Sequence, residues 1–258
     1  MGQIIRNMNK KNKPIVHSYF VCYNEENIIP HLLKYYLSFC EKVTIIDNGS
    51  TDKTVEIVKS FPNTEVINFD SKGEFHDGIH VQIKNSIWKK SVGVADYVIL
   101  GDSDEFLYHE NMLQFLIDSK EKGVTLFKPT GYHMVANEDF ILKSTDNLIE
   151  LVKNGVRTEV LDKMMMFDCN KIKEINYNFG CHSAFPFGEI KLYNNPDLKM
   201  LHYKFLGLEN HHYKYKIRGE RLSQFNRQNN FGTYYLMSEK EQVQDYQSYL
   251  NKSKKIIN

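Results

Sequence analysis

The sequence predicts an α/β fold with a mostly parallel sheet flanked by helices and a helical C-terminal extension. Three observations support this prediction. Short runs of β-branched and aromatic residues alternate with segments whose apolar residues recur at helical spacing. Polar clusters follow three of the apolar runs directly. The 258 residues, 41% hydrophobic and 25% charged, have the size and composition of one globular core. Strands that alternate with helices pair in parallel through right-handed crossovers.

The first hundred residues carry this alternation most clearly. The first expected elements are a strand at 15–23, a helix at 28–39, strands at 43–46 and 65–69, and a helix at 54–61 between these two strands. A loop or short irregular helix at 70–80, a helix at 81–92 and a strand at 97–100 come next. A strand at 123–127 and a hairpin or strand–helix unit over 163–177 follow. The domain organisation we expect is a flexible tail at 1–13, one domain over 14–205 and a tyrosine-rich helical extension packed on it over 206–258.

Charge, cysteine content and hydropathy exclude several classes of protein. The 33 basic and 32 acidic residues give a formal charge of +1, so no overall field indicates a nucleic-acid partner. The four cysteines form no C-x-x-C pair, which favours a reducing compartment without structural zinc. No apolar run reaches the roughly 18 residues of a membrane span, and Met1–Lys13 has no apolar segment typical of a signal peptide. We therefore expect a cytoplasmic protein, and contact with the inner face of a membrane stays open.

Polar clusters at three predicted strand ends indicate a ligand site. They are Asn24-Glu25-Glu26, Asp47-Asn48-Gly49-Ser50 and Asp102-Ser103-Asp104. In a parallel sheet such ends meet at one edge, where ligands bind. Two carboxylates at i and i+2 can reach one magnesium-type ion that also holds substrate phosphate. A solvated turn is the alternative, and an aspartyl-phosphate phosphatase is another, although its Asp-x-Asp belongs on the first strand and precedes Gly-Thr rather than Glu105-Phe106.

Together these motifs resemble a known family. Asn24-Glu25-Glu26, the run Val43 to Thr54 and Leu100-Gly101-Asp102-Ser103-Asp104-Glu105-Phe106 are similar, in order and spacing, to a family 2 type glycosyltransferase of the GT-A fold. The Asp-x-Asp-Glu-Phe form, with Lys163-x-x-x-Phe167, Gly180-Cys181-His182 and Leu201-His202-Tyr203, is more similar to the branch that shares features with family 92. The resemblance covers roughly residues 15–221.

The resemblance implies a nucleotide diphosphate sugar as donor, UDP-linked rather than GDP-linked, and Mn²⁺ or Mg²⁺ as cofactor. The implied donor-binding positions are Tyr23, Asn24, Glu26, Asp47, Asn85, Asp102, Ser103, Lys163, Lys216 and Arg218. The implied metal ligands are Asp102, Asp104 and His202. Structural roles remain open for several of them: a turn for Asp47, a helix cap for Glu26, a helix surface for Asn85 and the core for His202.

The catalytic base is left unassigned by the sequence. The family's acidic motif before Gln-x-x-Arg-Trp is absent, because Trp88 is the only tryptophan and lies upstream of Asp102. Candidates are His182, which could instead orient the acceptor or bind phosphate, Glu138, Asp139 and Glu189. The basic and aromatic segment 211–221 could close over the donor phosphates, contact a lipid surface or form a solvated helix face.

These features predict a metal-dependent glycosyltransferase that moves one sugar, with inversion, onto a glycan or a lipid-linked saccharide. A sugar nucleotidyltransferase or a phosphatase could use the same metal–phosphate edge. The nucleotidyltransferase normally has a glycine-rich, arginine-containing loop after its first strand, and Asn24-Glu25-Glu26 differs from that. A binding module for nucleotide sugars without turnover is the non-enzymatic alternative.

Overall fold

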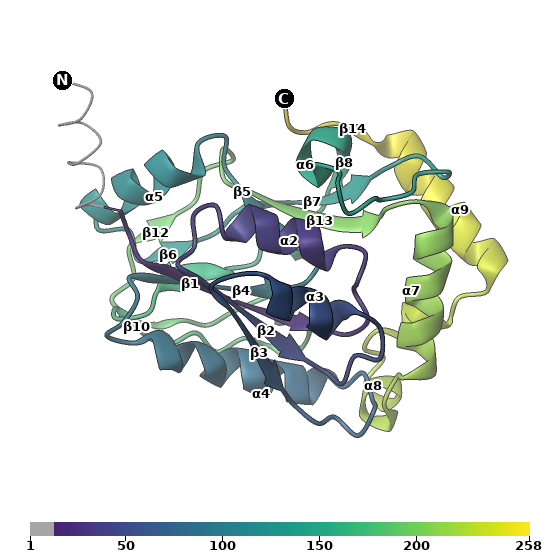
Figure 1. Cartoon of the computed structure of the whole chain (residues 1–258), viewed down its shortest axis with the longest axis horizontal. Helices are drawn as coiled ribbons and strands as arrows, with labels where there is room; N and C mark the ends of the chain where they lie inside the picture. The colour runs from purple at the N-terminus through teal and green to yellow at the C-terminus, as the bar shows by residue number, and fades with distance from the viewer. Residues whose placement is uncertain (1–12) are drawn as a thin grey trace.

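The computed structural model describes residues 13–258, so the tail expected at 1–13 lies outside the described residues except for Lys13. The main sheet has seven strands in the order β12-β6-β9-β4-β1-β2-β3 (Figure 1). Its strands are β1 (Val16–Cys22), β2 (Lys42–Asp47), β3 (Thr64–Asn68), β4 (Tyr97–Asp102), β6 (Leu126–Phe127), β9 (Met166–Asp168) and β12 (Leu192–Tyr193). The four consecutive strands β4, β1, β2 and β3, of which β3 is the edge strand, are parallel, whereas β9 runs antiparallel to β4 and β6. The predicted α/β class is confirmed.

Helices cover both faces of this sheet because its strands are apolar on both sides. The helices α2 (Ile29–Tyr36), α3 (Thr54–Ser60) and α5 (Met112–Glu121) contribute to one core cluster, together with Phe20 and Ile45 from the sheet. On the opposite face lie α4 (Asp77–Ser86) and the 3₁₀ helix η1 (Ile87–Ser91), where Trp88 packs with Tyr19 and Val98. The parallel strand ends are thereby fixed between two packed layers.

A second sheet, which the sequence did not predict, continues directly from the first. Its order is β14-β8-β7-β13-β5, with β5 (Glu105–Tyr108), β7 (Thr130–Val135), β8 (Asn154–Arg157), β13 (Lys199–Phe205) and β14 (Lys254–Lys255). Since β4 ends at Asp102 and β5 begins at Glu105, the chain passes from one sheet to the other at Ser103-Asp104. Both carboxylates of the Asp-x-Asp motif therefore lie at the junction of the sheets.

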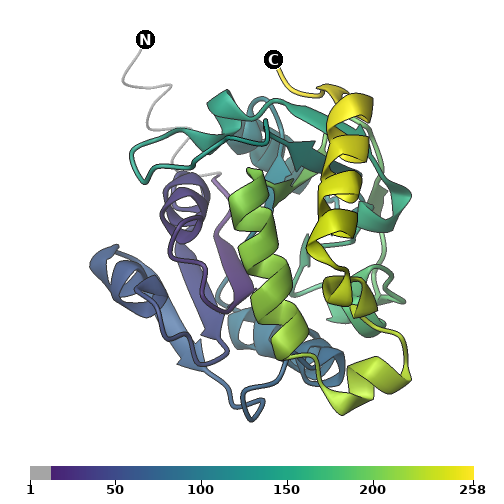
Figure 2. The same ribbon diagram turned by 90° about the vertical axis from the view of Figure 1, so that its right-hand side faces the viewer.

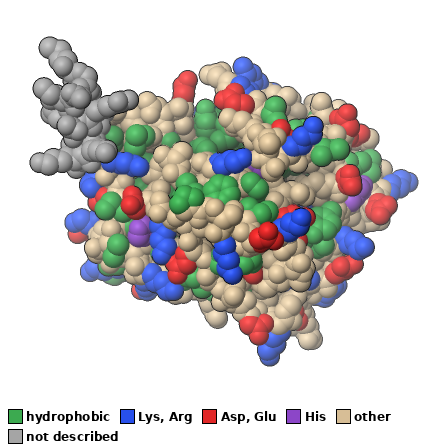
Figure 3. All heavy atoms as spheres, viewed as in Figure 1, with side chains coloured by type: hydrophobic (Ala, Val, Ile, Leu, Met, Phe, Trp, Pro, Cys, Tyr) green, Lys and Arg blue, Asp and Glu red, His purple; other side chains and the backbone are tan. Residues whose placement is uncertain are grey.

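The C-terminal part is helical, as expected, and packs against the strand ends. It consists of α7 (Leu208–Glu220), α8 (Gln224–Gln228), η4 (Thr233–Leu236) and α9 (Glu239–Lys252). Figure 2 shows α7 beside α9, and α7 also contacts β13 and η4. Charged side chains of both signs are interspersed over the face seen in Figure 3, in keeping with the near-zero net charge.

Two expected regions differ in detail. The segment 70–80, expected as a loop or a short irregular helix, is irregular only to His76, whose side chain accepts a hydrogen bond from the Ile79 backbone N–H and starts the regular helix α4 at Asp77. The 163–177 region forms β9 and then β10 (Ile172–Glu174), which pairs with β11 (Phe187–Gly188) as a hairpin. The remaining short helices are α6 (Leu148–Leu151), η2 (Glu159–Leu161) and η3 (Phe179–Cys181).

Candidate active site

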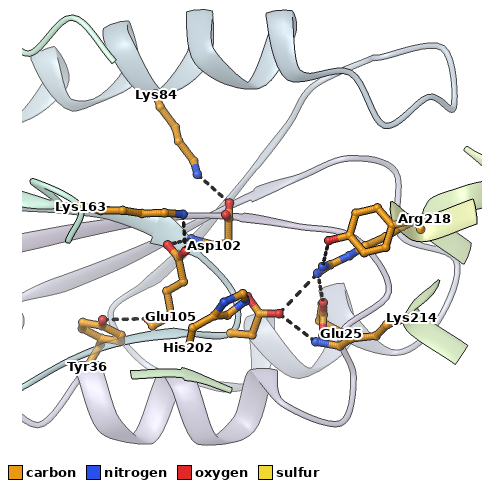
Figure 4. A network of polar contacts seen from close by, with 11 residues as sticks. Glu25, Tyr36, Lys84, Asp102, Glu105, Lys163, His202, Lys214 and Arg218 are labelled. Carbon is orange, nitrogen blue, oxygen red and sulfur yellow. Dashed lines mark hydrogen bonds and ion pairs between the residues drawn. The ribbon is translucent and has the colours of Figure 1, made fainter. Parts of the chain in front are cut away.

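A cleft of about 390 Å³ lies at the carboxyl ends of β1 and β4. Its floor is formed by the strand ends and its walls by α4, η3, α7 and η4. Charged side chains in and directly beside it form two groups of ion pairs, which Figure 4 shows on either side of the Asp-x-Asp turn. We call them the sheet cluster (Lys84, Asp102, Glu105 and Lys163) and the helix cluster (Glu25, Asp104, Lys214 and Arg218).

The sheet cluster links α4 to the start of the second sheet. Lys84 Nζ lies 2.6 Å from Asp102 Oδ1, and Lys163 Nζ pairs with Glu105 Oε1. Glu105 Oε2 accepts a hydrogen bond from the Asp102 backbone N–H at 3.2 Å. Tyr36 on α2 holds β5 in place, because its hydroxyl donates to the Glu105 carbonyl at 3.0 Å and accepts from the Leu107 N–H at 2.8 Å. The Asp102 side chain is 38% exposed and open to the cleft, whereas the side chains of Lys84, Lys163 and Glu105 are buried.

The helix cluster ties α7 to the strand ends. Lys214 Nζ lies 3.0 Å from Glu25 Oε2 and 3.1 Å from Asp104 Oδ2. Arg218 bridges the same two carboxylates at 3.2 and 3.4 Å, and it donates to the Tyr235 hydroxyl at 2.7 Å. The Glu25, Asp104 and Lys214 side chains are at most 8% exposed. Burial of this kind is tolerated because each carboxylate has a cationic partner.

These contacts and burial explain the pKa values of Asp102, Asp104 and Glu25. Burial opposes ionisation of Asp102 and Asp104, but Lys84 next to Asp102 and Lys214 next to Asp104 outweigh it and hold both pKa values below the ordinary range. For Glu25 burial prevails over Lys214, and the pKa is raised. The two aspartates of the motif are thus fixed as carboxylates at neutral pH.

Asp104 also faces His202 of β13. His202 Nε2 lies 3.4 Å from Asp104 Oδ1, and both residues line the cleft. Two ligands at right angles on a Mg²⁺-sized ion are about 3.0 Å apart, given metal–oxygen distances of about 2.1 Å. Among residues 13–258 no group of three or more His, Cys, Asp or Glu side chains is arranged to hold a metal. Two protein ligands plus substrate phosphate suffice for Mg²⁺, so this pair fits a shared site for ion and substrate.

Asp47 ends β2 next to the cleft. Its Oδ2 accepts hydrogen bonds from the Gly49 and Ser50 N–H groups, both at 3.0 Å, so it does shape the turn. Its Oδ1 is buried and has no partner within the described residues. Nearby, Arg221 stacks on Tyr23 with 3.2 Å between the guanidinium carbon and the ring centre, and both line the cleft. The free Asp47 oxygen needs a donor that the described residues do not supply.

His182 lies on the opposite wall at the end of η3. Its Nδ1 is 3.0 Å from the Val160 carbonyl, which makes Nδ1 the protonated nitrogen and leaves Nε2 as an acceptor. Although His182 is exposed at the cleft wall, partial desolvation of its ring and the nearby Lys163 lower its pKa to about 4. Gly180 and Cys181 before it both have positive φ, 72° and 55°. A Cβ at Gly180 would come within 2.8 Å of the His182 ring, so the glycine permits this ring position.

The other residues expected from the sequence are placed as follows. Ser103 lines the cleft, and its N–H donates to the Val21 carbonyl. Asn85 is turned away, since its amide pairs with the Tyr177 backbone at 2.7 and 3.2 Å, and Lys84 beside it faces the cleft instead. Lys216 is exposed and outside the cleft lining, whereas Arg218 on the same helix lines the cleft.

The turn residues and the acidic base candidates lie elsewhere. Asn24 and Glu26 bind the backbone of the Thr51–Lys53 turn and line a neighbouring hollow of about 400 Å³. Glu138 and Asp139 line a third hollow beside α9. Glu189 pairs with Lys171 at 2.9 Å and is outside the cleft lining. Of the four base candidates, His182 is the one that lines the cleft.

Sequence reasoning missed several residues of the site. Lys84, Glu105 and Arg221 line the cleft, Lys214 pairs with Asp104 beside it, and Glu25 was noted only as part of a cluster. Lys214 and Arg218 are four residues apart on α7 and so share a face, which is a signal that helical periodicity could have supplied. Their partners lie far away in the chain, so the sequence holds no local sign of the pairing.

Comparison with known proteins identifies the family. The family model described as "Glycosyl transferase family 2" matches residues 19–187, more than half of the chain. A comparison with curated proteins found no match. No helix within residues 13–258 combines the length and apolar character needed to cross a bilayer.

Solved structures with a similar chain path include the following two proteins. Glucosyl-3-phosphoglycerate synthase from Mycobacterium tuberculosis, in complex with Mn²⁺, UDP and glucosyl-3-phosphoglycerate, is 18% identical, with a TM-score of 0.33 over 48% of this chain and 46% of that one. S. aureus TarS is 14% identical, with a TM-score of 0.47 over 92% of this chain and 43% of that one. This chain thus spans less than half the length of either protein.

Proposed function

The chain belongs to glycosyltransferase family 2, and we propose that its cleft transfers one sugar from a UDP-sugar to a hydroxyl group of a glycan or a lipid-linked saccharide, with inversion. Membership of the family makes the protein an enzyme that uses a nucleotide sugar. Within the family, the Asp-x-Asp-Glu-Phe form favours the branch similar to family 92. A phosphatase or a nucleotidyltransferase is disfavoured by the family match.

The observation that carries the proposal is the unpartnered Asp47 Oδ1. A buried carboxylate oxygen without a donor costs free energy, on the order of 1–3 kcal/mol or more. A ribose hydroxyl or the N3–H of uracil can donate to it, and Asn48, which follows Asp47, lines the cleft together with the stacked pair Tyr23 and Arg221. These contacts support a nucleoside at the end of β2.

A divalent cation, Mn²⁺ or Mg²⁺, belongs to the proposal because Asp104 and His202 fit it. Asp104 Oδ1 and His202 Nε2 would hold the ion, and Asp102 lies two residues away with one oxygen on Lys84. When bound, the ion supplies positive charge for the diphosphate that leaves. Lys84 and Lys163 line the same cleft, where they offset the negative charges of Asp102 and Glu105.

We assign the role of general base to His182. In the displacement, the acceptor oxygen forms a bond to the anomeric carbon, the bond from that carbon to the diphosphate breaks, and the hydroxyl proton passes to His182 Nε2. The Val160 carbonyl keeps Nδ1 protonated and so keeps Nε2 available. A pKa of about 4 leaves the imidazole neutral at pH 7, as a base requires, although it also makes the base weak.

Binding of nucleotide sugars tests the central proposal. We expect UDP-sugars to bind in a calorimetric panel with Mn²⁺ present, and Asp47→Asn to weaken binding by about 10–100-fold, because a hydrogen bond to a charged group contributes about 1.5–3 kcal/mol. Asp70→Asn is the matched control, since Asp70 is an exposed turn residue. A panel in which no nucleotide sugar binds contradicts the proposal, and a folded protein that binds without any turnover is a binding module.

The base assignment has its own test. His182→Ala should lower kcat by about 10²–10⁴-fold, the range for loss of a general base, and leave the Kd of the donor unchanged. His212→Ala is the control, because His212 bonds Gln242 on α9 and is not among the residues that line the cleft. A His182→Ala enzyme with the kcat of the parent would remove His182 from the mechanism.

A further inference from the structure

We propose that His133 on β7 is a positioning residue for the cation site, because it accepts a hydrogen bond from His202 Nδ1 and thereby directs His202 Nε2 toward the ion. The inference rests on the cation that the proposed function assigns to Asp104 and His202. It adds a residue that is not among those that line the cleft. Two observations carry it: the contact between the two imidazole rings, and the unpaired nitrogen in each of them.

The second sheet brings the two rings together. His133 and His202 are register partners on the parallel strands β7 and β13. Their ring centres are 5.0 Å apart, and the ring planes are inclined by 45°. A ring nitrogen lies about 1.1 Å from the centre of an imidazole, so two facing nitrogens at this spacing can approach to about 2.8 Å, which is a hydrogen-bond distance. The pairing of the strands therefore places the two rings within hydrogen-bonding reach.

Each ring has one buried nitrogen that is unpaired. His133 Nδ1 and His202 Nδ1 are both buried, and neither has a hydrogen-bond partner within the described residues. Most buried polar atoms in folded proteins are paired, so each exception requires an explanation. Other buried side-chain atoms within residues 13–258 also lack a partner, but no other two of them belong to rings that contact each other. This pair thus differs from an isolated unpaired atom in the core.

Binding of a cation decides which of the two nitrogens donates. His202 Nε2 faces Asp104 Oδ1 at 3.4 Å. A ring nitrogen that binds an ion is unprotonated, so the proton of His202 is then on Nδ1. A neutral His133 can accept this N–H at its own Nδ1, with its proton on Nε2. Histidine ligands of metals ordinarily donate their second N–H to such an acceptor, which fixes the tautomer and the orientation of the ring.

Packing fixes the orientation of the His133 ring. Phe205 on β13 and Tyr249 on α9 meet it edge to face, with ring centres 5.9 Å and 5.4 Å away and planes at 90° and 84°. The strand β7 also lies between β8 and β13 in the second sheet. His133 is therefore held by the sheet and by α9, and an apolar side chain of similar size would fill the same space without offering an acceptor.

Binding of Mn²⁺ to the full chain in the presence of UDP tests the proposal, measured by electron paramagnetic resonance against a UDP blank without protein. We expect His133→Leu to raise the Kd for Mn²⁺ by about 10–100-fold, the range for losing the partner of a metal ligand. His133→Asn should stay within about threefold of the parent, because its amide oxygen can accept close to the position of Nδ1. His31→Leu is the matched control, since His31 is also buried with an unpaired nitrogen but lies on α2 and lines a different hollow.

Nuclear magnetic resonance of the parent protein provides a test that needs no variant. With nitrogen-15-labelled histidine, Mg²⁺ and UDP, we expect His202 to be protonated at Nδ1 and His133 to be unprotonated at Nδ1. A scalar coupling between these two nitrogens should report the hydrogen bond directly. A space-filling role for His133 would produce neither the coupling nor this pair of tautomers. A His133 ring that carries its proton on Nδ1 in the Mg²⁺-bound protein overturns the proposal.

The outcomes separate this inference from the proposed function. Near-ultraviolet circular dichroism shows whether each variant is folded. An unchanged Kd for Mn²⁺ in folded His133→Leu overturns the inference and leaves the proposed function intact. Equal losses in His133→Leu and His133→Asn also overturn it, because they would show that packing rather than the acceptor matters. A parent protein that binds no Mn²⁺ with UDP removes the cation site from the proposed function, and this inference with it.

Discussion

The sheet cluster and the helix cluster hold the same charges in different ways. Each combines two carboxylates with two cations around one aspartate of the Asp-x-Asp turn. The sheet cluster is built entirely within residues 19–187, which match the family model, whereas Lys214 and Arg218 lie beyond that range on α7. Asp102 is thus neutralised by residues within the matched range, and Asp104 by a helix outside it.

Solvent access separates the two clusters as well. The Asp102 side chain is 38% exposed and the Asp104 side chain 2%. Water can replace a lost partner of Asp102, but it reaches Asp104 poorly. Breaking an ion pair should therefore cost more in the helix cluster than at Asp102, and the buried Lys163–Glu105 pair gives a reference within the sheet cluster.

The largest effect should come from removing a buried lysine. Lys214→Met and Lys163→Met each leave a carboxylate without its closest cation, and we expect each to lower the free energy of unfolding by about 3–5 kcal/mol in urea titrations. The two variants should lose local stability in different segments. Hydrogen exchange should lose protection in α7 for Lys214→Met and at the start of β5 for Lys163→Met. Equal loss in both regions in both variants would show that the clusters act as one unit.

Substitution of the two aspartates should have a smaller effect, a loss of turnover that is greater for Asp104 than for Asp102. Asp104→Asn removes the carboxylate that faces His202, and we expect turnover, measured as release of nucleoside diphosphate, to fall by about 10²–10³-fold, the range for losing one electrostatic contact to the transition state. Asp102→Asn should lose less, because Lys84 can still contact the amide oxygen. The reverse order of losses would make Asp102 the main ligand.

The smallest effect is on the pH dependence of stability, which follows from the pKa values of the clusters' carboxyl groups. Because Asp102 and Asp104 have lowered pKa values in the folded state, their contribution to stability is complete above the unfolded value of about 3.9 and is lost as the pH falls through the folded values. The raised pKa of Glu25 acts in the opposite sense, since the folded chain binds that proton more readily than the unfolded chain. Carbon-13 NMR of the carboxyl groups should show Glu25 titrating above 4.5 and Asp102 below 3.8. An Asp102 midpoint above 3.8 contradicts its pairing with Lys84.

The sequence predicted the parallel strands and the Asp-x-Asp motif far better than the second sheet and the helix cluster. Periodicity placed β1, β2, β3 and β4, and the polar residues after them placed Asp47, Asp102 and Asp104 at one edge. The expectation for His202 rested on the family resemblance, and the structure brings that residue to 3.4 Å from Asp104. The neighbouring positions Lys84 and Asn85 show the limit of such reasoning, because one residue of helical rotation decides which faces the cleft.

The second sheet and the helix cluster could not be predicted because both depend on contacts between distant segments. The strands β7 and β13 are parallel neighbours with many elements between them in the chain. The ion pairs of Lys214 likewise join α7 to the residues that follow β1 and β4, and charged helix residues are ordinarily solvated. Burial of Lys214 is a property of the packed fold that local patterns do not record.

Asp104 and its two cations lie more than a hundred residues apart in the chain. Proteins are synthesised from the N-terminus, so Glu25 and Asp104 leave the ribosome well before Lys214 and Arg218. Pairing of these two carboxylates therefore requires a segment from the last fifth of the chain, so a chain that ended before α7 would leave Glu25 and Asp104 without Lys214 and Arg218.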